Sequence, residues 1–224
     1  MIQKNLNALR QTFDGNVVTL VAVSKTKPDA QILEAYHAQQ RIFGENYVQE
    51  LVEKHDRLPH DIAWHFIGHL QSNKVKYIVP FVSLIHSVDS LKLLVEIDKQ
   101  AKRCGRVVDC LLQIYIAQEE TKFGFEAEEI LHLIDKQIFT DLTNINVIGL
   151  MAMASNTTDV EQLTKEFLGA KALFDRLGLE RRFSNFLMRE LSIGMSSDCG
   201  LAIACGSTMI RVGSAIFGQR NYIV

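Results

Sequence analysis

The chain has 224 residues, of which 47% are hydrophobic, and its 24 lysines and arginines nearly balance its 26 aspartates and glutamates. This apolar content excludes a disordered chain, and a net charge of −2 without a long basic run argues against a nucleic-acid partner. The first residues lack the apolar core of a signal peptide, and no stretch reaches the ~18 apolar residues that cross a bilayer, so we expect a soluble cytoplasmic protein without membrane contact.

Strand and helix patterns alternate along the whole chain. Short apolar runs predict eight strands, at residues 18–24, 41–44, 63–68, 82–88, 107–116, 146–153, 189–194 and 209–213. A helix is expected at about residues 2–13, ahead of the first strand, and a helical segment follows each strand. This alternation is typical of parallel βα units.

The predicted helix after the sixth strand has the clearest pattern. Thr158 and Glu161 match a capping box, and apolar residues then recur at three- and four-residue steps until Gly178. Further helices are expected from Pro28 and over residues 46–57, 74–78, 90–103, 126–137 and 198–204. Eight right-handed βα units of this size predict a single (β/α)8 barrel domain over residues 1–224, with an extra N-terminal helix. The alternative, an open doubly wound sheet, lacks its usual G-x-G-x-x-G after the first strand.

Polar and glycine residues stand where several predicted strands end. In a barrel these ends open on one face, where active sites lie. The candidate site residues there are Lys25, Asn46, His69, Lys122, Ser192, Ser196, Ser197, Arg211, Gly213 and Ser214. If the fold is a barrel, these positions converge on one site.

The last two of these loops predict a phosphate site. Gly194-Met195-Ser196-Ser197 follows the seventh strand and Gly213-Ser214 lies at the eighth. Glycine lets the backbone approach an anion, and serine adds a hydroxyl donor. Each loop alone could be an ordinary turn, whereas the matched pair favours phosphate.

Lys25, at the end of the first strand, faces this predicted site. An amine attacks a carbonyl only when it is unprotonated, so the pKa of such a lysine must be lowered by burial or by a nearby cation such as Arg211. A reactive lysine beside a phosphate site predicts a Schiff base. Two ligands fit this chemistry: a sugar phosphate, as in a lysine-dependent aldolase, or pyridoxal 5′-phosphate (PLP).

Seven motifs carry a family resemblance: VAVSKTKP, FGENYVQE, WHFIGHLQSNK, TKFGF, GLMAM, LSIGMSSD and IRVGSAIFG. In this order they resemble the pyridoxal phosphate homeostasis protein family over about residues 20–220. That family is similar to the N-terminal barrel domain of alanine racemase and lacks the second domain of that enzyme. The resemblance makes the aldolase alternative a remote one.

The resemblance implies that Lys25 carries PLP as a covalent aldimine and that Arg211 lies near the pyridine nitrogen. It implies that four residues surround the phosphate: Ser196, Ser197, Gly213 and Ser214. Asn46 and Ser192 fall in family motifs that line the pocket, and Lys122 matches a lysine that could hand the cofactor in or out. The implied function is binding, buffering and delivery of PLP to apo-enzymes by a monomer, with effects on amino-acid and keto-acid balance.

The resemblance implies no established catalytic turnover. An arginine beside the ring nitrogen keeps that nitrogen unprotonated and weakens the ring as an electron sink. In alanine racemase a second base comes from the domain that this family lacks. A weak PLP-dependent racemase remains the alternative.

Cysteine and histidine positions predict no metal site. None of Cys104, Cys110, Cys199 and Cys205 forms a C-x-x-C pair, and we expect free thiols. His65 and His69 lie in WHFIGH, without the glutamate of an H-E-x-x-H motif. We expect His65 and His86 to be interior or surface histidines.

Overall fold

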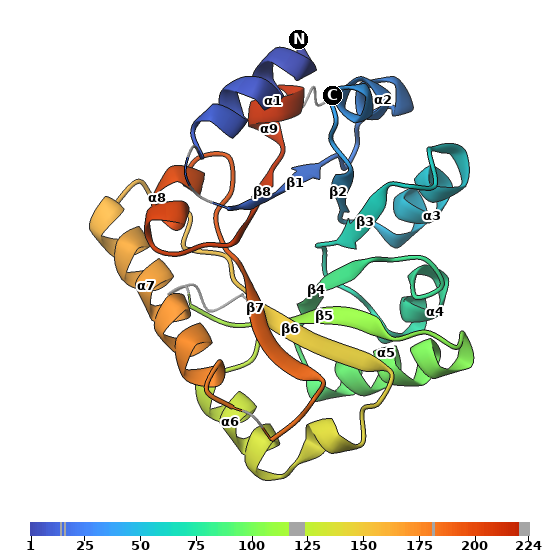
Figure 1. Ribbon diagram of the computed structural model, residues 1–224, viewed down its shortest axis with the longest axis vertical. Helices are drawn as coiled ribbons and strands as arrows, with labels where there is room; N and C mark the ends of the chain where they lie inside the picture. Colours follow the sequence, from blue (N-terminus) through green and yellow to red (C-terminus); the bar gives the residue numbers. More distant parts are fainter. Residues whose placement is uncertain (14, 16, 117–123, 181, 220–224) are drawn as a thin grey trace.

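A computed structural model describes residues 1–13, 15, 17–116, 124–180 and 182–219 of the chain. Its strands pair in parallel and in sequence order, and they close into a barrel (Figure 1). The strands are β1 (Thr19–Val23), β2 (Ile42–Glu45), β3 (Ala63–Phe66), β4 (Leu84–Val88), β5 (Val108–Gln113), β6 (Ile145–Met151), β7 (Phe186–Ser192) and β8 (Met209–Val212). The predicted (β/α)8 fold is confirmed.

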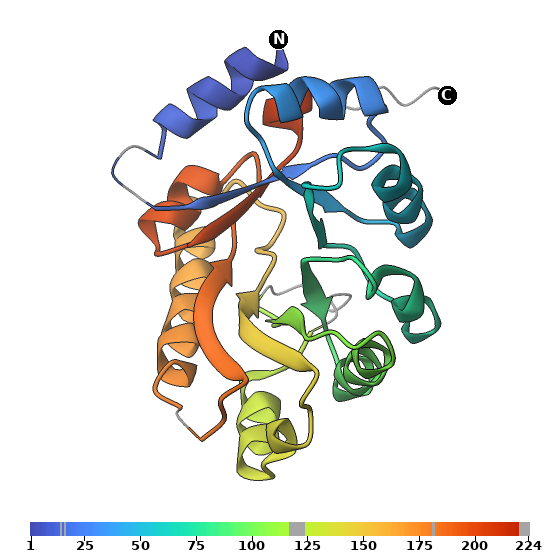
Figure 2. The same ribbon diagram turned by 45° about the vertical axis from the view of Figure 1, so that its right-hand side comes forward.

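Helices surround the barrel on its outer side (Figure 2). The α-helices are α1 (Ile2–Gln11), α2 (Asp29–His37), α3 (Val48–Arg57), α4 (Val75–Ile78), α5 (Leu91–Arg103), α6 (Ala127–Asp135), α7 (Val160–Leu177), α8 (Cys199–Ala204) and α9 (Ser214–Phe217), and the short 3-10 helices are η1 (Ser72–Lys74) and η2 (Ile138–Thr140). Within the described ranges, no helix is long and apolar enough to span a membrane.

Strand alternation divides the apolar residues between two cores. Along β1, Val21 joins the filling of the barrel, whereas Leu20 and Ala22 belong to the larger core between the strands and the helices. Successive side chains of a strand point to opposite faces, which explains this division. Leu111 and Met209 pack with Val21, so the barrel interior is filled and the site lies at its end.

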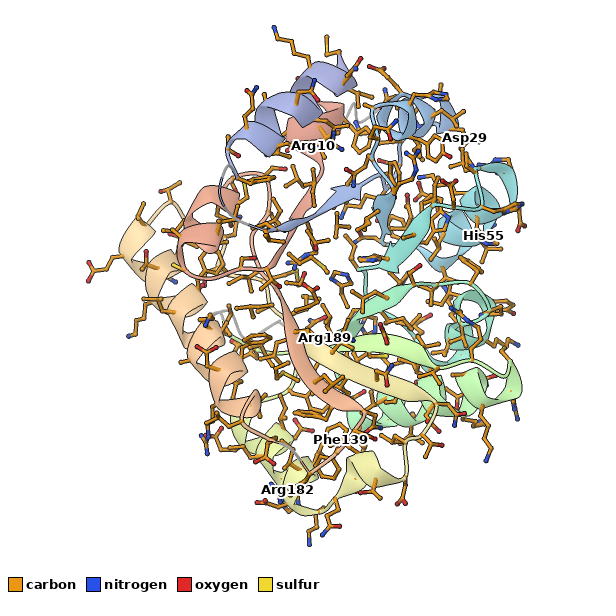
Figure 3. The ribbon with its side chains drawn as sticks, viewed as in Figure 1. Arg10, Asp29, His55, Phe139, Arg182 and Arg189 are labelled. Atoms are coloured by element: carbon orange, nitrogen blue, oxygen red, sulfur yellow. The ribbon has the colours of Figure 1, made fainter. Side chains whose placement is uncertain are left out.

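The first and last elements of the chain meet. β1 pairs with β8, which closes the barrel, and Val21 lies opposite Arg211 in this pairing. Asn5 Nδ2 on α1 donates a hydrogen bond to the carbonyl oxygen of Ile216 on α9. Arg10, labelled in Figure 3, donates from α1 to the carbonyl oxygen of Ala38, beyond the end of α2. Helix α1 therefore braces α9, the segment that begins with Ser214.

Several expected bounds were wrong: β5 ends at Gln113 rather than 116, β6 ends at Met151 rather than 153, and two further differences have a clear cause. β7 begins at Phe186 rather than 189, because Phe186 pairs with Val147 of β6 and is buried. The N-cap of α7 is Asp159 rather than Thr158: the Asp159 carboxylate accepts the backbone N–H groups of Glu161 and Gln162 at 2.9 and 3.2 Å. A carboxylate accepts both amides at once and also interacts favourably with the helix N-terminus.

Candidate functional site

A cavity of about 740 Å³ opens at the carboxyl ends of the strands. Among the described residues, three cationic side chains line it, those of Lys25, Lys27 and Arg211. No carboxylate is among its lining residues in the described part of the chain. The cavity has the size of a small-molecule site, and its charge favours an anionic ligand.

Lys25 enters this cavity from a tight turn directly after β1. The backbone N–H of Lys27 donates to the carbonyl oxygen of Ser24 at 3.0 Å, which closes the turn around Lys25. The next residue, Thr26, has a φ of 61°. This left-handed conformation is unfavourable for a β-branched residue and persists only when surrounding contacts hold it. The position of the Lys25 amine therefore depends on what holds this turn.

Arg211 lies on β8 with only 5% of its surface exposed. One terminal nitrogen donates to the carbonyl oxygen of Ser192 at 2.6 Å and to its Oγ at 2.7 Å, and the other donates to the carbonyl oxygen of Ala152 at 2.9 Å. Burial lowers the pKa of Arg211 to about 10, so it stays charged at neutral pH. Because these three acceptors are neutral oxygens, its positive charge remains available to a ligand.

The loops after β7 and β8 are joined to each other. Ser196 Oγ accepts the backbone N–H of Gly213 at 3.2 Å. Gly194 has a φ of 94°, and a Cβ there would lie 2.5 Å from Cβ of Ala202, so only glycine fits. The backbone N–H groups of Ser196, Ser197, Ser214 and Ala215 meet no acceptor in the part of the chain that the structure describes. These amides are free to bind an anion.

Asn46 follows β2 and lines the same cavity. Its Oδ1 is buried and has no hydrogen-bond partner among the described residues. The loop after β3 packs closely against the backbone of Asn46, because a Cβ at Gly68 would lie 2.2 Å from the Asn46 carbonyl oxygen. A buried acceptor without a donor is costly, and a donor group on a ligand would offset that cost.

A buried chain of hydrogen bonds leads from Arg211 into the barrel. Beyond Ser192 Oγ it continues to His86 Nδ1 at 3.1 Å, and from His86 Nε2 to His65 Nδ1 at 3.0 Å. Burial lowers the pKa of His65 to about 3. Burial also lowers the pKa of His86 far below its usual value, with smaller contributions from His65 and Arg211. Both rings are therefore neutral, and the chain holds Arg211 without adding charge. Of the two placements expected for these histidines, interior or surface, the structure shows the interior one for both.

Acidification should destabilise the protein through these histidines. In the unfolded chain a histidine gains a proton below its ordinary pKa of 6.5, whereas folded His65 stays neutral down to about 3, so stability is lost as the pH falls between these values. His65 alone should lower the free energy of unfolding by about 2 kcal/mol between pH 7 and pH 5. Urea unfolding at the two pH values measures this change. The loss should persist in 1 M NaCl, which screens surface charges; an unchanged free energy would contradict the prediction.

The structure brings most of the predicted site residues to the wall of one cavity: Lys25, Asn46, Ser196, Ser197, Arg211, Gly213 and Ser214. Ser192 differs, because its side chain is fully buried behind this wall, against Arg211 and His86. His69 is not part of the wall and contacts Asp89 at 3.1 Å. Lys122 lies outside the described residues. Ligand contacts of all these residues stay predictions.

Several lining residues were not among the candidates, and two of them stand beside candidate residues in the sequence, Lys27 and Met195. Lys27 Nζ donates to the carbonyl oxygens of Phe217 and Gly218 at 3.3 Å each, so it links the Lys25 turn to α9. Its position two residues after Lys25 could have identified Lys27 as a residue of the site. Met195 stands between Gly194 and Ser196 in the LSIGMSSD motif, so its neighbours in the sequence indicate a place at the site.

Solved structures that are similar to this one share its barrel. PipY of Synechococcus elongatus, solved with PLP bound, is 36% identical and superposes with a TM-score of 0.88 over 97% of this chain and 100% of that chain. Alanine racemase from Streptomyces coelicolor is 18% identical, with a TM-score of 0.73 over 98% of this chain and 58% of that chain. At this identity the racemase shows the fold alone.

Sequence comparison gives relatives over nearly the full length. The family model described as "Alanine racemase, N-terminal domain" matches residues 1–221. The pyridoxal phosphate homeostasis protein of Haemophilus influenzae is 40% identical over 99% of this chain and 97% of its own length. Its counterpart in Aquifex aeolicus is 39% identical over 92% of this chain and 89% of its own length. The chain therefore belongs to the pyridoxal phosphate homeostasis protein family, the single-barrel relatives of the alanine racemase N-terminal domain.

Proposed function

We propose that this protein binds PLP in the cavity at the barrel mouth and serves vitamin B6 homeostasis by buffering and delivering the cofactor. One observation carries the proposal: a strand-end lysine shares a cavity with an arginine and with two linked loops, in which four backbone N–H groups meet no acceptor among the described residues. Relatives that carry this function by name match nearly the whole chain. PipY, which binds PLP in its structure, has the same barrel.

Each end of the cofactor has matching groups in this cavity. Lys25 forms the covalent link: its amine nitrogen adds to the aldehyde carbon, a C=N bond forms, and the aldehyde oxygen leaves as water. The phosphate is held by the two linked loops, through the residues Ser196, Ser197, Gly213 and Ser214. Anionic phosphate suits a cavity with three cations and no lining carboxylate among the described residues.

The other contacts concern the ring. Arg211, held in place by Ser192 and Ala152, faces the pyridine nitrogen in this proposal and keeps it unprotonated. The orphaned Oδ1 of Asn46 accepts a donor from the ligand. Lys122 serves as a transfer lysine for entry or release. When bound, PLP supplies an aldehyde and an electron-withdrawing ring, and the protein supplies their orientation.

The same barrel domain, residues 1–224, acts as a monomer in the cytoplasm and meets PLP-dependent apo-enzymes transiently. The test starts from purified protein mixed with PLP. We expect an absorbance band in the near-ultraviolet or visible range and, after borohydride reduction, a modified peptide that contains Lys25. Apo-enzyme separated by a dialysis membrane should gain less activity than apo-enzyme mixed with the loaded protein. A protein that leaves PLP unmodified and unbound would exclude the proposal.

A weak amino-acid racemase is the second candidate, supported by the shared fold. We expect no efficient racemisation, because Arg211 leaves the ring nitrogen unprotonated and the described lining residues include no histidine, tyrosine or carboxylate as a second base. Deuterium exchange and chiral analysis of alanine, serine and glutamate check this. Turnover of roughly 1 s⁻¹ or more, the ordinary range of enzymes, would put the racemase first.

A further inference from the structure

A buried charge cluster lies beside the Lys25 turn and outside the cavity. It consists of Lys54 and Glu50 on α3 and Glu45 at the end of β2. The Lys54 side chain is 3% exposed and that of Glu45 is fully buried. Lys54 Nζ donates to Glu45 Oε1 at 2.8 Å and to Glu50 Oε1 at 2.6 Å. In Figure 3 the label of His55 marks the helix that carries this lysine.

The cluster holds both neighbours of Lys25. On one side, the carbonyl oxygen of Ser24 accepts from Lys54 Nζ at 2.8 Å, and Ser24 Oγ donates to Glu45 Oε1 at 2.6 Å. On the other side, the backbone N–H of Thr26 donates to Glu50 Oε1 at 2.6 Å. The contact to Thr26 holds the residue with the left-handed backbone. The tight turn around Lys25 thus rests on one ammonium group and two carboxylates.

A buried cluster of this kind is a poor way to gain stability alone. Taking charges out of water costs free energy, and apolar side chains of similar volume often serve a core equally well. Glu45 bears this cost: burial raises its pKa, and its Oε2 has no hydrogen-bond partner in the described structure. What apolar residues could not supply are the directed bonds to Ser24 and Thr26. The bonds fix the direction in which the turn presents its central side chain.

We propose that Lys54 is a positioning residue, which fixes the Lys25 turn so that the Lys25 amine meets the cofactor aldehyde. The inference rests on the proposed function. Formation of the C=N bond, with loss of water, needs the amine nitrogen within reach of the aldehyde carbon and correctly oriented. Displacement of a reacting group by about 1 Å can cost 10²-fold. The proposed phosphate and ring contacts come from residues of other loops, and the turn is linked to the end of α9 through Lys27, which Lys54 does not contact.

Two ligands distinguish a role of Lys54 in positioning the Lys25 amine from a role in the stability of the fold. PLP has the aldehyde, and pyridoxine 5′-phosphate has an alcohol in its place and cannot form the C=N bond. In Lys54→Met we expect the Kd of PLP to rise roughly tenfold or more. The Kd of pyridoxine 5′-phosphate should change less than about twofold, which is within the scatter of distant substitutions. The borohydride-reducible fraction on Lys25 should fall in parallel.

A control variant and a rescue pair complete the design. Asp98→Ala removes the acceptor of the Asn144 backbone N–H, next to the start of β6, and should destabilise the fold while keeping the wild-type ratio of the two Kd values. Glu50→Ala removes the acceptor of Thr26 from a partly exposed position and should lower the preference for PLP. Glu50→Gln keeps an oxygen there and should restore it. If Lys54→Met fails to fold, the comparison of Glu50→Ala with Glu50→Gln tests whether the cluster positions Lys25.

The outcomes are distinct. A selective loss of PLP affinity in Lys54→Met, or in Glu50→Ala with rescue by Glu50→Gln, supports the inference. Equal weakening of both ligands, or an unchanged ratio in these variants, overturns it and assigns the cluster to folding. A wild-type protein that shows no preference for PLP over pyridoxine 5′-phosphate would instead mean that the covalent link, and with it the proposed function of Lys25, has failed.

Discussion

Lys25→Ala should abolish the borohydride-reducible link between the protein and PLP. Lys25 projects from the end of β1 into the cavity that also holds Arg211 and the two linked loops. Alanine has no amine, so no C=N bond can form at this position. Phosphate and ring contacts remain, and the variant should still bind PLP reversibly with a weaker Kd. Mass spectrometry after reduction should show complete loss of the covalent adduct.

Lys27→Ala is the matched control for this experiment. Lys27 lines the same cavity and stands two residues away, but its Nζ donates to the carbonyl oxygens of Phe217 and Gly218. We expect Lys27→Ala to keep a stoichiometric adduct on Lys25. Peptide mapping that finds the reduced adduct on Lys27 or another lysine, and an undiminished adduct in Lys25→Ala, would show that the wrong lysine has been assigned.

Removal of the phosphate from the ligand should weaken binding at least about 100-fold. Charge-assisted hydrogen bonds contribute about 1.5–3 kcal/mol each, so two of them already reach this factor. Four backbone amides that meet no acceptor among the described residues, together with the hydroxyls of Ser196, Ser197 and Ser214, offer more donors than that. Titration with PLP and with pyridoxal measures the difference, and both ligands retain the aldehyde that Lys25 needs.

A second pair of ligands controls for the aldehyde. Pyridoxine 5′-phosphate and pyridoxine also differ only in the phosphate, and neither can react with Lys25. The ratio of their affinities should match that of PLP and pyridoxal if the phosphate loops act independently of the lysine. Equal affinities within both pairs would show that the loops after β7 and β8 bind no phosphate.

Sequence patterns predicted the barrel because each βα unit carries its own local signal. Apolar runs bounded by polar turns located the strands, and a parallel closed sheet then brings their ends together whatever the loops contain. For this reason Lys25 and Arg211 could be assigned to one cavity before any contact was known. The start of β7 was missed because Phe186 is buried by pairing with β6, which no local pattern records.

The contacts that hold the Lys25 turn and Arg211 in place could not be predicted from the sequence. The i,i+4 spacing of Glu50 and Lys54 on a polar helix is typical of an ordinary surface ion pair. Lys54 is buried because α3 packs against the ends of β1 and β2, which the sequence pattern does not indicate. His86 reaches Ser192 across the barrel interior, a contact between residues 106 positions apart. Such contacts depend on strand register and inward orientation, which amino-acid type alone does not fix.

Closure of the barrel makes the site a late product of folding. Closure requires β1 to pair with β8, and it requires Asn5 to form its hydrogen bond to Ile216, which lies 211 positions away along the chain. Contacts of such long range form slowly, because loop-closure entropy is lost before they stabilise the chain. A nascent chain that has released only its first strands presents Lys25 without Arg211 and without the loops after β7 and β8. We therefore expect capture of PLP to require a closed barrel, and we do not expect PLP to act as an early template for folding.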